Sequence, residues 1–162
     1  MEGIRIIEYA ASYQEDIIAL ILSIQQDEFH VAITREDQPD LSDIPGFYQQ
    51  GKGNFWLAIY DDQVIGTIAL VDIGNGQGAL RKMFVKAAFR GSRYNTGHQL
   101  LQQLLIWAKQ QDMGVIYLGT TEKFLAAHRF YEKNKFVQIE KRELPTSFPV
   151  MKVDNRFYQR KL

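Results

Sequence analysis

The segment from Arg90 to His98 combines glycines, arginines and small polar residues directly before a leucine-rich run. Gly91 and Gly97 allow the backbone to approach a ligand closely, because glycine carries no side chain. If a helix begins here, its first N–H groups are unpaired and carry a partial positive charge, which suits a phosphate. We therefore predict a pyrophosphate cradle, although a glycine-containing turn with solvated arginines would explain the same residues. The candidate phosphate-binding residues are Arg90, Gly91, Ser92, Arg93, Tyr94, Asn95, Thr96, Gly97 and His98.

The remainder of the sequence excludes several other kinds of chemistry. It contains neither the GxxxxGK[ST] pattern of a P-loop nor a GxGxxG pattern after an N-terminal strand. The 162 residues include no cysteine, which excludes disulfides, thiolate zinc sites, iron–sulfur clusters and a cysteine nucleophile. Lys plus Arg and Asp plus Glu number 19 each, so no net charge attracts the protein to nucleic acid. We expect one domain over residues 1–162, cytoplasmic, with no metal, no signal peptide and no membrane span.

The spacing of apolar residues predicts elements of mixed type. Strands are expected at residues 4–9, 54–60, 63–73, 79–85, 115–118, 137–140 and 153–160. Helices are expected at 13–29, after Gly97 as far as about Gly114, and at 123–134, with a short helix at 41–50 in an irregular arm. Adjacent Arg81 and Lys82 interrupt the alternation of the strand at 79–85, which a β-bulge would explain. The order predicts an α/β (α+β) fold whose sheet is mainly antiparallel, with a parallel crossover where a helix joins two strands.

Two segments resemble the motifs of the GNAT superfamily of N-acetyltransferases. Val85 to Gly97, with the leucine-rich helix that follows, resembles motif A, which in that family grips the pyrophosphate of acetyl-CoA. Phe124 to Phe136 resembles motif B, which ends in Leu/Phe-Tyr-Glu-Lys-x-Gly-Phe. Asn95 and Lys135 stand where the family usually has glycine, and asparagine is the non-glycine residue that best tolerates a positive φ.

The resemblance implies a GNAT-like sheet of about six to seven strands with about four helices, acetyl-CoA as cosubstrate and an amine as acceptor. It leaves a homodimer open. It also implies that backbone groups of Met83, Phe84 and Val85 bind the pantetheine arm and the acetyl carbonyl. Tyr131 matches the tyrosine that protonates the departing thiolate, although a core aromatic on an amphipathic helix would explain it too. The predicted strand at 79–85 carries no carboxylate to act as general base, so the candidates are Asp72, Glu28, Glu122, His30, His128 and a chain of waters.

The acceptor and the function class stay open at this point. The acidic residues of the arm either attract a cationic amine or are simply solvated, and nearby aromatic residues either line an acceptor pocket or belong to the core. Three hypotheses follow: an N-acetyltransferase, a coenzyme A-binding sensor without turnover, and a non-catalytic interaction module. The acidic residues are Glu28, Glu36, Asp37, Asp40 and Asp43, and the aromatic residues are Phe29, Phe47, Tyr48 and Phe55.

Overall fold

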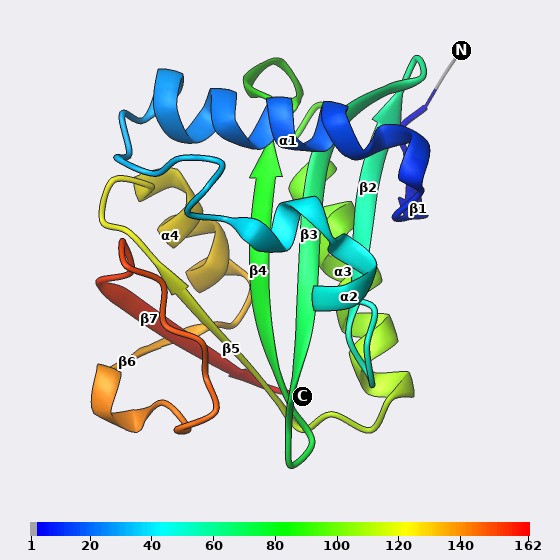
Figure 1. The fold of residues 1–162 in the computed structure, drawn as a ribbon. Helices are drawn as coiled ribbons and strands as arrows, with labels where there is room; N and C mark the ends of the chain where they lie inside the picture. Colours follow the sequence, from blue (N-terminus) through cyan, green and yellow to red (C-terminus); the bar gives the residue numbers. More distant parts are fainter. Residues whose placement is uncertain (1–2) are drawn as a thin grey trace.

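The computed structural model describes residues 3–162, which form a seven-stranded sheet with helices on both faces (Figure 1). Its order is β1-β2-β3-β4-β5-β7-β6, and all neighbouring strands are antiparallel except β4 and β5, which are parallel. The strands are β1 (Arg5–Glu8), β2 (Asn54–Tyr60), β3 (Gln63–Gly74), β4 (Gln77–Val85), β5 (Val115–Thr120), β6 (Val137–Ile139) and β7 (Arg156–Lys161). The predicted mixed, mainly antiparallel sheet is confirmed.

Four α-helices cover the two faces of the sheet. In Figure 1, α1 (Gln14–Leu22) and α2 (Ile44–Phe47) lie in front of the sheet, and α3 (Thr96–Gln110) and α4 (Leu125–Lys133) lie behind it. β2 is buried on both sides because successive side chains point to opposite faces: Phe55 packs with the α1 side, whereas Trp56 packs with the α3 side. Each face therefore has its own hydrophobic cluster.

Three predicted boundaries need correction. The helix expected at 13–29 is α-helical only to Leu22 and continues as a π-helix over Ser23–Glu28. The helix expected at 41–50 is a 3-10 turn over Pro39–Ser42 followed by α2, whose first turn is capped by the Asp43 carboxylate. The last strand begins at Arg156 rather than 153, because the chain before it closes a turn in which Met151 N donates to the Asp154 carboxylate at 2.9 Å.

The feature that shapes the functional region is the divergence of the two parallel strands. β4 and β5 pair only from Gln77, opposite Val115, to Ala79, opposite Tyr117. Beyond these pairs the two strands separate, as Figure 1 shows between the green and yellow-green arrows. The second half of β4 therefore exposes backbone and side chains on the side facing β5.

Candidate functional site

A cavity of about 590 Å³ lies where β4 and β5 diverge. β4 from Leu80 to Val85, the end of β5, the inner side of α4, the loop before α3 and the turn before β7 form its walls. The predicted cofactor residues that line it are Met83, Phe84, Val85, Arg90, Gly91, Ser92, Asn95, Gly97 and His98. The structure thus brings most of the predicted site residues to one cavity.

The loop before α3 has the backbone geometry of an anion cradle. Gly91 has φ +91° and Asn95, which precedes α3, has φ +55° in the left-handed region. The Asn95 N–H donates to the Gly91 carbonyl at 3.0 Å, and Gln99 N donates to the Asn95 carbonyl at 3.0 Å. The N–H groups of Thr96, Gly97 and His98, in the first turn of α3, therefore have no intrahelical partner and can meet a ligand. Asn95 therefore keeps the conformation that glycine usually supplies at this place.

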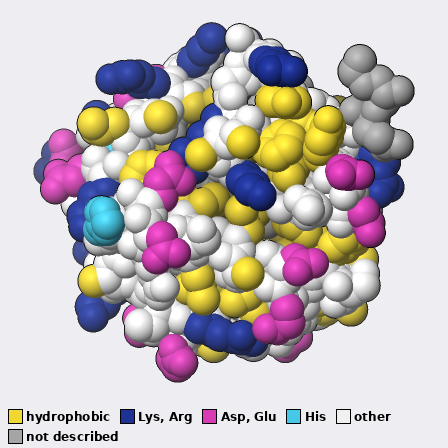
Figure 2. Space-filling model, turned by 90° about the horizontal axis from the view of Figure 1, so that it is seen from above, with side chains coloured by type: hydrophobic (Ala, Val, Ile, Leu, Met, Phe, Trp, Pro, Cys, Tyr) yellow, Lys and Arg dark blue, Asp and Glu magenta, His cyan; other side chains and the backbone are white. Residues whose placement is uncertain are grey.

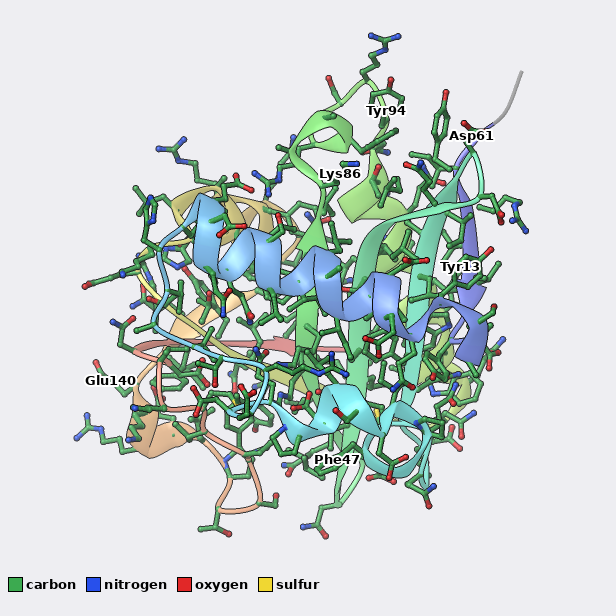
Figure 3. The ribbon with its side chains drawn as sticks, turned by 45° about the horizontal axis from the view of Figure 1, so that its top comes forward. Tyr13, Phe47, Asp61, Lys86, Tyr94 and Glu140 are labelled. Atoms are coloured by element: carbon green, nitrogen blue, oxygen red, sulfur yellow. The ribbon has the colours of Figure 1, made fainter. Side chains whose placement is uncertain are left out.

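Several other residues of this loop make contacts that stabilise the conformation of the loop. Arg93 and Tyr94 do not line the cavity; the Arg93 guanidinium lies 5.1 Å from the centre of the Tyr94 ring, and Figure 3 shows Tyr94 at the tip of the loop. Thr96 is buried outside the cavity and donates to the Phe89 carbonyl at 2.9 Å. Arg90 lines the cavity, but its guanidinium pairs with Glu28 and also donates to the Val85 carbonyl at 2.8 Å.

A β-bulge distorts β4 where Arg81 and Lys82 interrupt the apolar pattern. The register passes from Ala69 opposite Arg81 to Thr67 opposite Phe84, so two residues of β4 face one of β3. Lys82 takes φ +52°, and its carbonyl accepts a hydrogen bond from the Thr67 hydroxyl at 2.6 Å. The bulge that would explain the sequence pattern is therefore present, and it opens the ladder directly beside the cavity.

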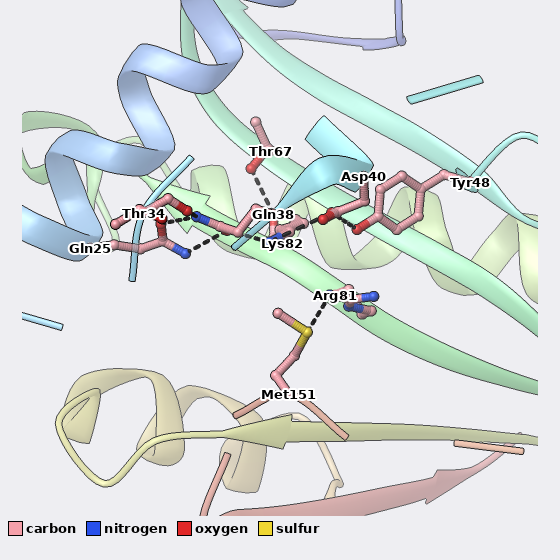
Figure 4. Close-up of polar contacts among 9 residues, drawn as sticks. All are labelled: Gln25, Thr34, Gln38, Asp40, Tyr48, Thr67, Arg81, Lys82 and Met151. Carbon is pink, nitrogen blue, oxygen red and sulfur yellow. Dashed lines mark hydrogen bonds and ion pairs between the residues drawn. The ribbon is translucent and has the colours of Figure 1, made fainter. Parts of the chain in front are cut away.

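Lys82 ties the bulge to the acidic arm, as Figure 4 shows. Its ammonium group donates to Gln38 and lies 3.6 Å from the Asp40 carboxylate, which also accepts from the Tyr48 hydroxyl. Burial lowers the pKa of Lys82 to about 8, although Asp40 favours its charged form. Both ions are buried, so the expectation that Asp40 is solvated or faces a substrate is wrong.

Three other acidic residues of the arm have partners of their own, whereas Glu36 is exposed. Glu28 pairs with Arg90, Asp37 accepts from Thr34 N at 3.0 Å, and Asp43 accepts from Gly46 N at 3.1 Å. None of the arm carboxylates lines the cavity, so the arm presents no acidic face to it within residues 3–162. Of the arm aromatics, Phe29 lines the cavity, Phe47 is exposed, and Tyr48 and Phe55 are core residues.

Tyr131 is both a core residue and part of the cavity wall. Its side chain is 5% exposed and packs near Phe136 and Tyr158, yet it lines the cavity opposite β4. Burial raises the pKa of its hydroxyl well above the ordinary value, so the group stays protonated at neutral pH. Lys135, which follows α4 at the position usually held by glycine, takes φ +71° and so keeps the glycine-like conformation.

The structure separates most of the candidate general bases from the cavity. Asp72 accepts from Lys52 N at 3.0 Å and from Gly74 N at 2.9 Å. It lies near the C-terminal end of β3, away from the bulged stretch. Glu122 and His30 are exposed and line no part of the cavity. His128 is fully engaged, because its Nε2 bonds to the Thr121 carbonyl at 2.9 Å and its Nδ1 to Arg156 at 3.0 Å. Glu28 does not line the cavity either, but it pairs with Arg90, which does.

Within residues 3–162 the carboxylate that does line the cavity is Asp154, which no sequence pattern singled out. It lies in the turn before β7, so close to Gly119 of β5 that a Cβ there would stand 2.6 Å from one carboxylate oxygen. Burial raises its pKa, while the Met151 N–H, Arg81 and Lys82 oppose that rise. Lys133 and Asn134 at the end of α4 also line the cavity; they lie within the segment that resembles motif B but were not among the predicted site residues.

No group of three or more His, Asp or Glu side chains among residues 3–162 could hold a metal ion. None of the helices there is long and apolar enough to cross a bilayer.

The comparisons with known proteins agree with this geometry. A profile described as "Acetyltransferase (GNAT) family" matches residues 18–136, so the chain belongs to the GNAT family of acetyltransferases. The crystal structure of a GNAT-family acetyltransferase from Staphylococcus aureus Mu50 is similar at 46% identity and TM-score 0.95, covering 98% of this chain and 99% of that chain.

Two further similar proteins carry more specific names. N-acetylaspartate synthetase of Danio rerio is 30% identical over 106 residues, which cover 64% of this chain and 37% of that protein. The chain thus spans little more than a third of that relative's length. N-acetylglutamate synthase of Neisseria gonorrhoeae, crystallised with coenzyme A and N-acetyl-glutamate, matches at TM-score 0.74 and 16% identity over 98% of this chain and 35% of that chain. At that identity the likeness shows the fold alone.

Proposed function

We propose that this protein is an acetyl-CoA-dependent N-acetyltransferase that transfers the acetyl group to a primary amine by direct attack in a ternary complex. The observation that carries the proposal is the arrangement of one cavity. Its rim holds the cradle loop, its wall holds the bulged stretch of β4, and Tyr131 faces that stretch from α4. These are the three parts that thioester binding, carbonyl polarisation and thiolate protonation need.

In this mechanism the amine nitrogen attacks the thioester carbonyl carbon, a C–N bond forms and the C–S bond breaks. Backbone N–H groups from Met83 to Val85 stabilise the oxyanion, because the bulge leaves part of β4 outside the regular ladder. Tyr131 gives its proton to the departing sulfur. Asp154 takes the proton that the amine loses, since it is the carboxylate that lines the cavity within residues 3–162 and burial makes it more basic than usual.

The coenzyme A-binding sensor has lost its main support. That hypothesis relied on the absence of glycine at positions 95 and 135, but Asn95 and Lys135 both adopt the positive φ that glycine would allow. The departures from the motifs therefore leave the backbone geometry of the site intact.

The test is an acceptor screen with acetyl-CoA. The released thiol is followed by a colour reaction, whose background is low because the chain has no cysteine, and the product is identified by mass spectrometry. The names N-acetylaspartate synthetase and N-acetylglutamate synthase place amino acids in the panel, beside diamines and peptide amines. We expect thiol release matched by one acetylated amine; coenzyme A binding with no acetylated product from any amine would overturn the proposal in favour of the sensor.

A further inference from the structure

Arg81 is a cation of the cavity wall that makes no direct ion pair in the described residues, although its charge acts on the nearby Asp154 carboxylate. Its guanidinium donates to the Met151 sulfur at 2.7 Å, a weak acceptor, and lies 6.0 Å from the centre of the Tyr48 ring. No carboxylate oxygen of residues 3–162 forms an ion pair with it within 4.0 Å. Because a guanidinium has five N–H donors, most of the hydrogen-bonding capacity of Arg81 remains unused.

Two other cations of the cavity wall differ from Arg81 in this respect. Lys82 is paired with Asp40 and donates to Gln38, and Arg90 is paired with Glu28. In Figure 4 the Lys82 side chain reaches toward Gln38 and Asp40, whereas the Arg81 side chain reaches toward Met151. Arg81 can therefore receive a ligand anion without breaking an ion pair of the fold; Lys133, at the exposed end of α4, is a further lining cation without such a pair within residues 3–162.

The position of Arg81 separates it from the cradle loop. It precedes Val85 by four residues, roughly 13 Å along a strand at about 3.3 Å per residue. The pyrophosphate is expected at the loop beyond Val85, and the acetyl group beside the bulge between the two. Arg81 thus belongs to the part of the cavity that lies past the acetyl group, where an acceptor must enter.

We propose that the acceptor amine also carries a carboxylate, as an amino acid does, and that the Arg81 guanidinium binds this carboxylate. The inference rests on the proposed acetyltransferase function and deepens it by naming the substrate class. A guanidinium matches a carboxylate with two parallel N–H···O bonds, which a lysine cannot reproduce. Asp154, in the turn before β7, then faces the amine end of the same molecule. This assignment replaces the expectation of a cationic acceptor, because none of the arm carboxylates lines the cavity.

The test compares acceptors that differ only in the carboxylate. Glycine, β-alanine, aspartate and glutamate are each measured against the corresponding amide, with putrescine as a cationic amine. We expect kcat/KM for the preferred acid to exceed that for its amide by about 10- to 100-fold, the usual range for a hydrogen-bonded charge. Arg81→Gln should abolish this preference while leaving KM for acetyl-CoA nearly unchanged, and Arg81→Lys should restore part of it. Arg142→Gln, at an exposed position that does not line the cavity, is the matched control and should behave as wild type.

A binding measurement makes the result independent of turnover. Calorimetry of the same acid and amide pairs is performed on the coenzyme A-saturated protein and on the folded Arg81 variants. Acid binding that depends on Arg81 supports the carboxylate site, even if the acceptor screen fails and the acetyltransferase proposal falls. Equal binding of acids and amides, or an acid preference that survives Arg81→Gln, would overturn this inference while leaving acetyl transfer intact.

Discussion

At the scale of single residues, Tyr131 combines core packing with a place on the cavity wall, so its proposed catalytic role is compatible with its structural one. The aromatic packing of its ring explains its burial, and the cavity explains why the hydroxyl is useful. Because the raised pKa keeps the phenol protonated across the neutral range, the proton is available until a thiolate develops beside it.

Tyr131→Phe is expected to lower kcat by at least about tenfold, since positioned acid catalysis contributes about 10²–10⁴ in rate. The phenyl ring retains the packing, so KM for acetyl-CoA and the melting temperature should change little. Steady-state kinetics and a thermal melt on the same preparation provide the check. Wild-type turnover in this variant would leave the thiolate to be protonated by solvent and would end the assignment.

Asp154→Asn is expected to reduce kcat and to change its pH dependence. A base works only when deprotonated, so activity should rise with pH through the pKa of Asp154, which burial places above the ordinary aspartate value. The plot of kcat against pH for the variant should lose the rise caused by Asp154 and keep only the rise caused by deprotonation of the acceptor amine. Asp112→Asn, at an exposed turn position with φ +59° that asparagine tolerates, is the control and should keep the wild-type profile.

At the scale of elements, the bulge in β4 is the feature on which the site depends. Arg81 and Lys82 are adjacent in sequence, yet Arg81 lies near the Tyr48 ring and Lys82 pairs with Asp40, the partner of the Tyr48 hydroxyl. The extra residue therefore brings two successive side chains to the same side of the sheet, which a regular strand cannot do.

Thr67→Val is expected to loosen the bulge and to lower kcat more than coenzyme A affinity. The substitution keeps the shape of the side chain but removes the donor to the Lys82 carbonyl, and an unsatisfied buried acceptor costs about 1–3 kcal/mol. Denaturant unfolding and kinetics measure the two effects separately. Thr146→Val on an exposed loop serves as the control. Full activity in a destabilised Thr67→Val protein would show that the bulge does not position the reacting groups.

The sequence predicted the elements better than it predicted their contacts. Apolar periodicity located the strands and helices because burial on one face of a sheet or helix leaves a local pattern in the sequence. The π-helical end of the first helix left no such pattern: it contains Gln25, whose side chain forms a hydrogen bond with that of Gln38, 13 residues further along the chain. The same limit applies to Asp40 and Asp154. Their burial and partners come from segments that meet only in the folded chain, so no spacing could mark one as structural and the other as part of the cavity.

At the scale of the whole molecule, the cavity lies between two parts of one sheet. The strands β1 to β4 and the strands β5 to β7 are joined by the short paired stretch that begins at Gln77 and Val115. On the face seen in Figure 2, hydrophobic side chains lie among Lys, Arg, Asp and Glu, with both charges interspersed. Because the cavity lies between the two parts of the sheet, a ligand bound in it would contact both parts and hold them together. This links ligand binding to the stability of the whole fold.

Coenzyme A is accordingly expected to stabilise the whole fold. At 100 times its Kd a ligand contributes about 2.7 kcal/mol, which for a chain of this size corresponds to roughly 5–10 °C in melting temperature. Gly97→Val should reduce this gain to about half, since tenfold weaker binding lowers the contribution to about 1.4 kcal/mol at the same concentration. A Cβ at Gly97 would stand 3.4 Å from Met83 Cε and from a ring carbon of Phe130, so the branched side chain extends into the space between β4 and α4. Gly114→Val, where a Cβ meets no atom within 4 Å, is the matched control and should retain the full shift. An unchanged shift in a Gly97→Val protein that melts normally without ligand would place the phosphates away from the loop, because a side chain in a cradle cannot leave its ligand undisturbed.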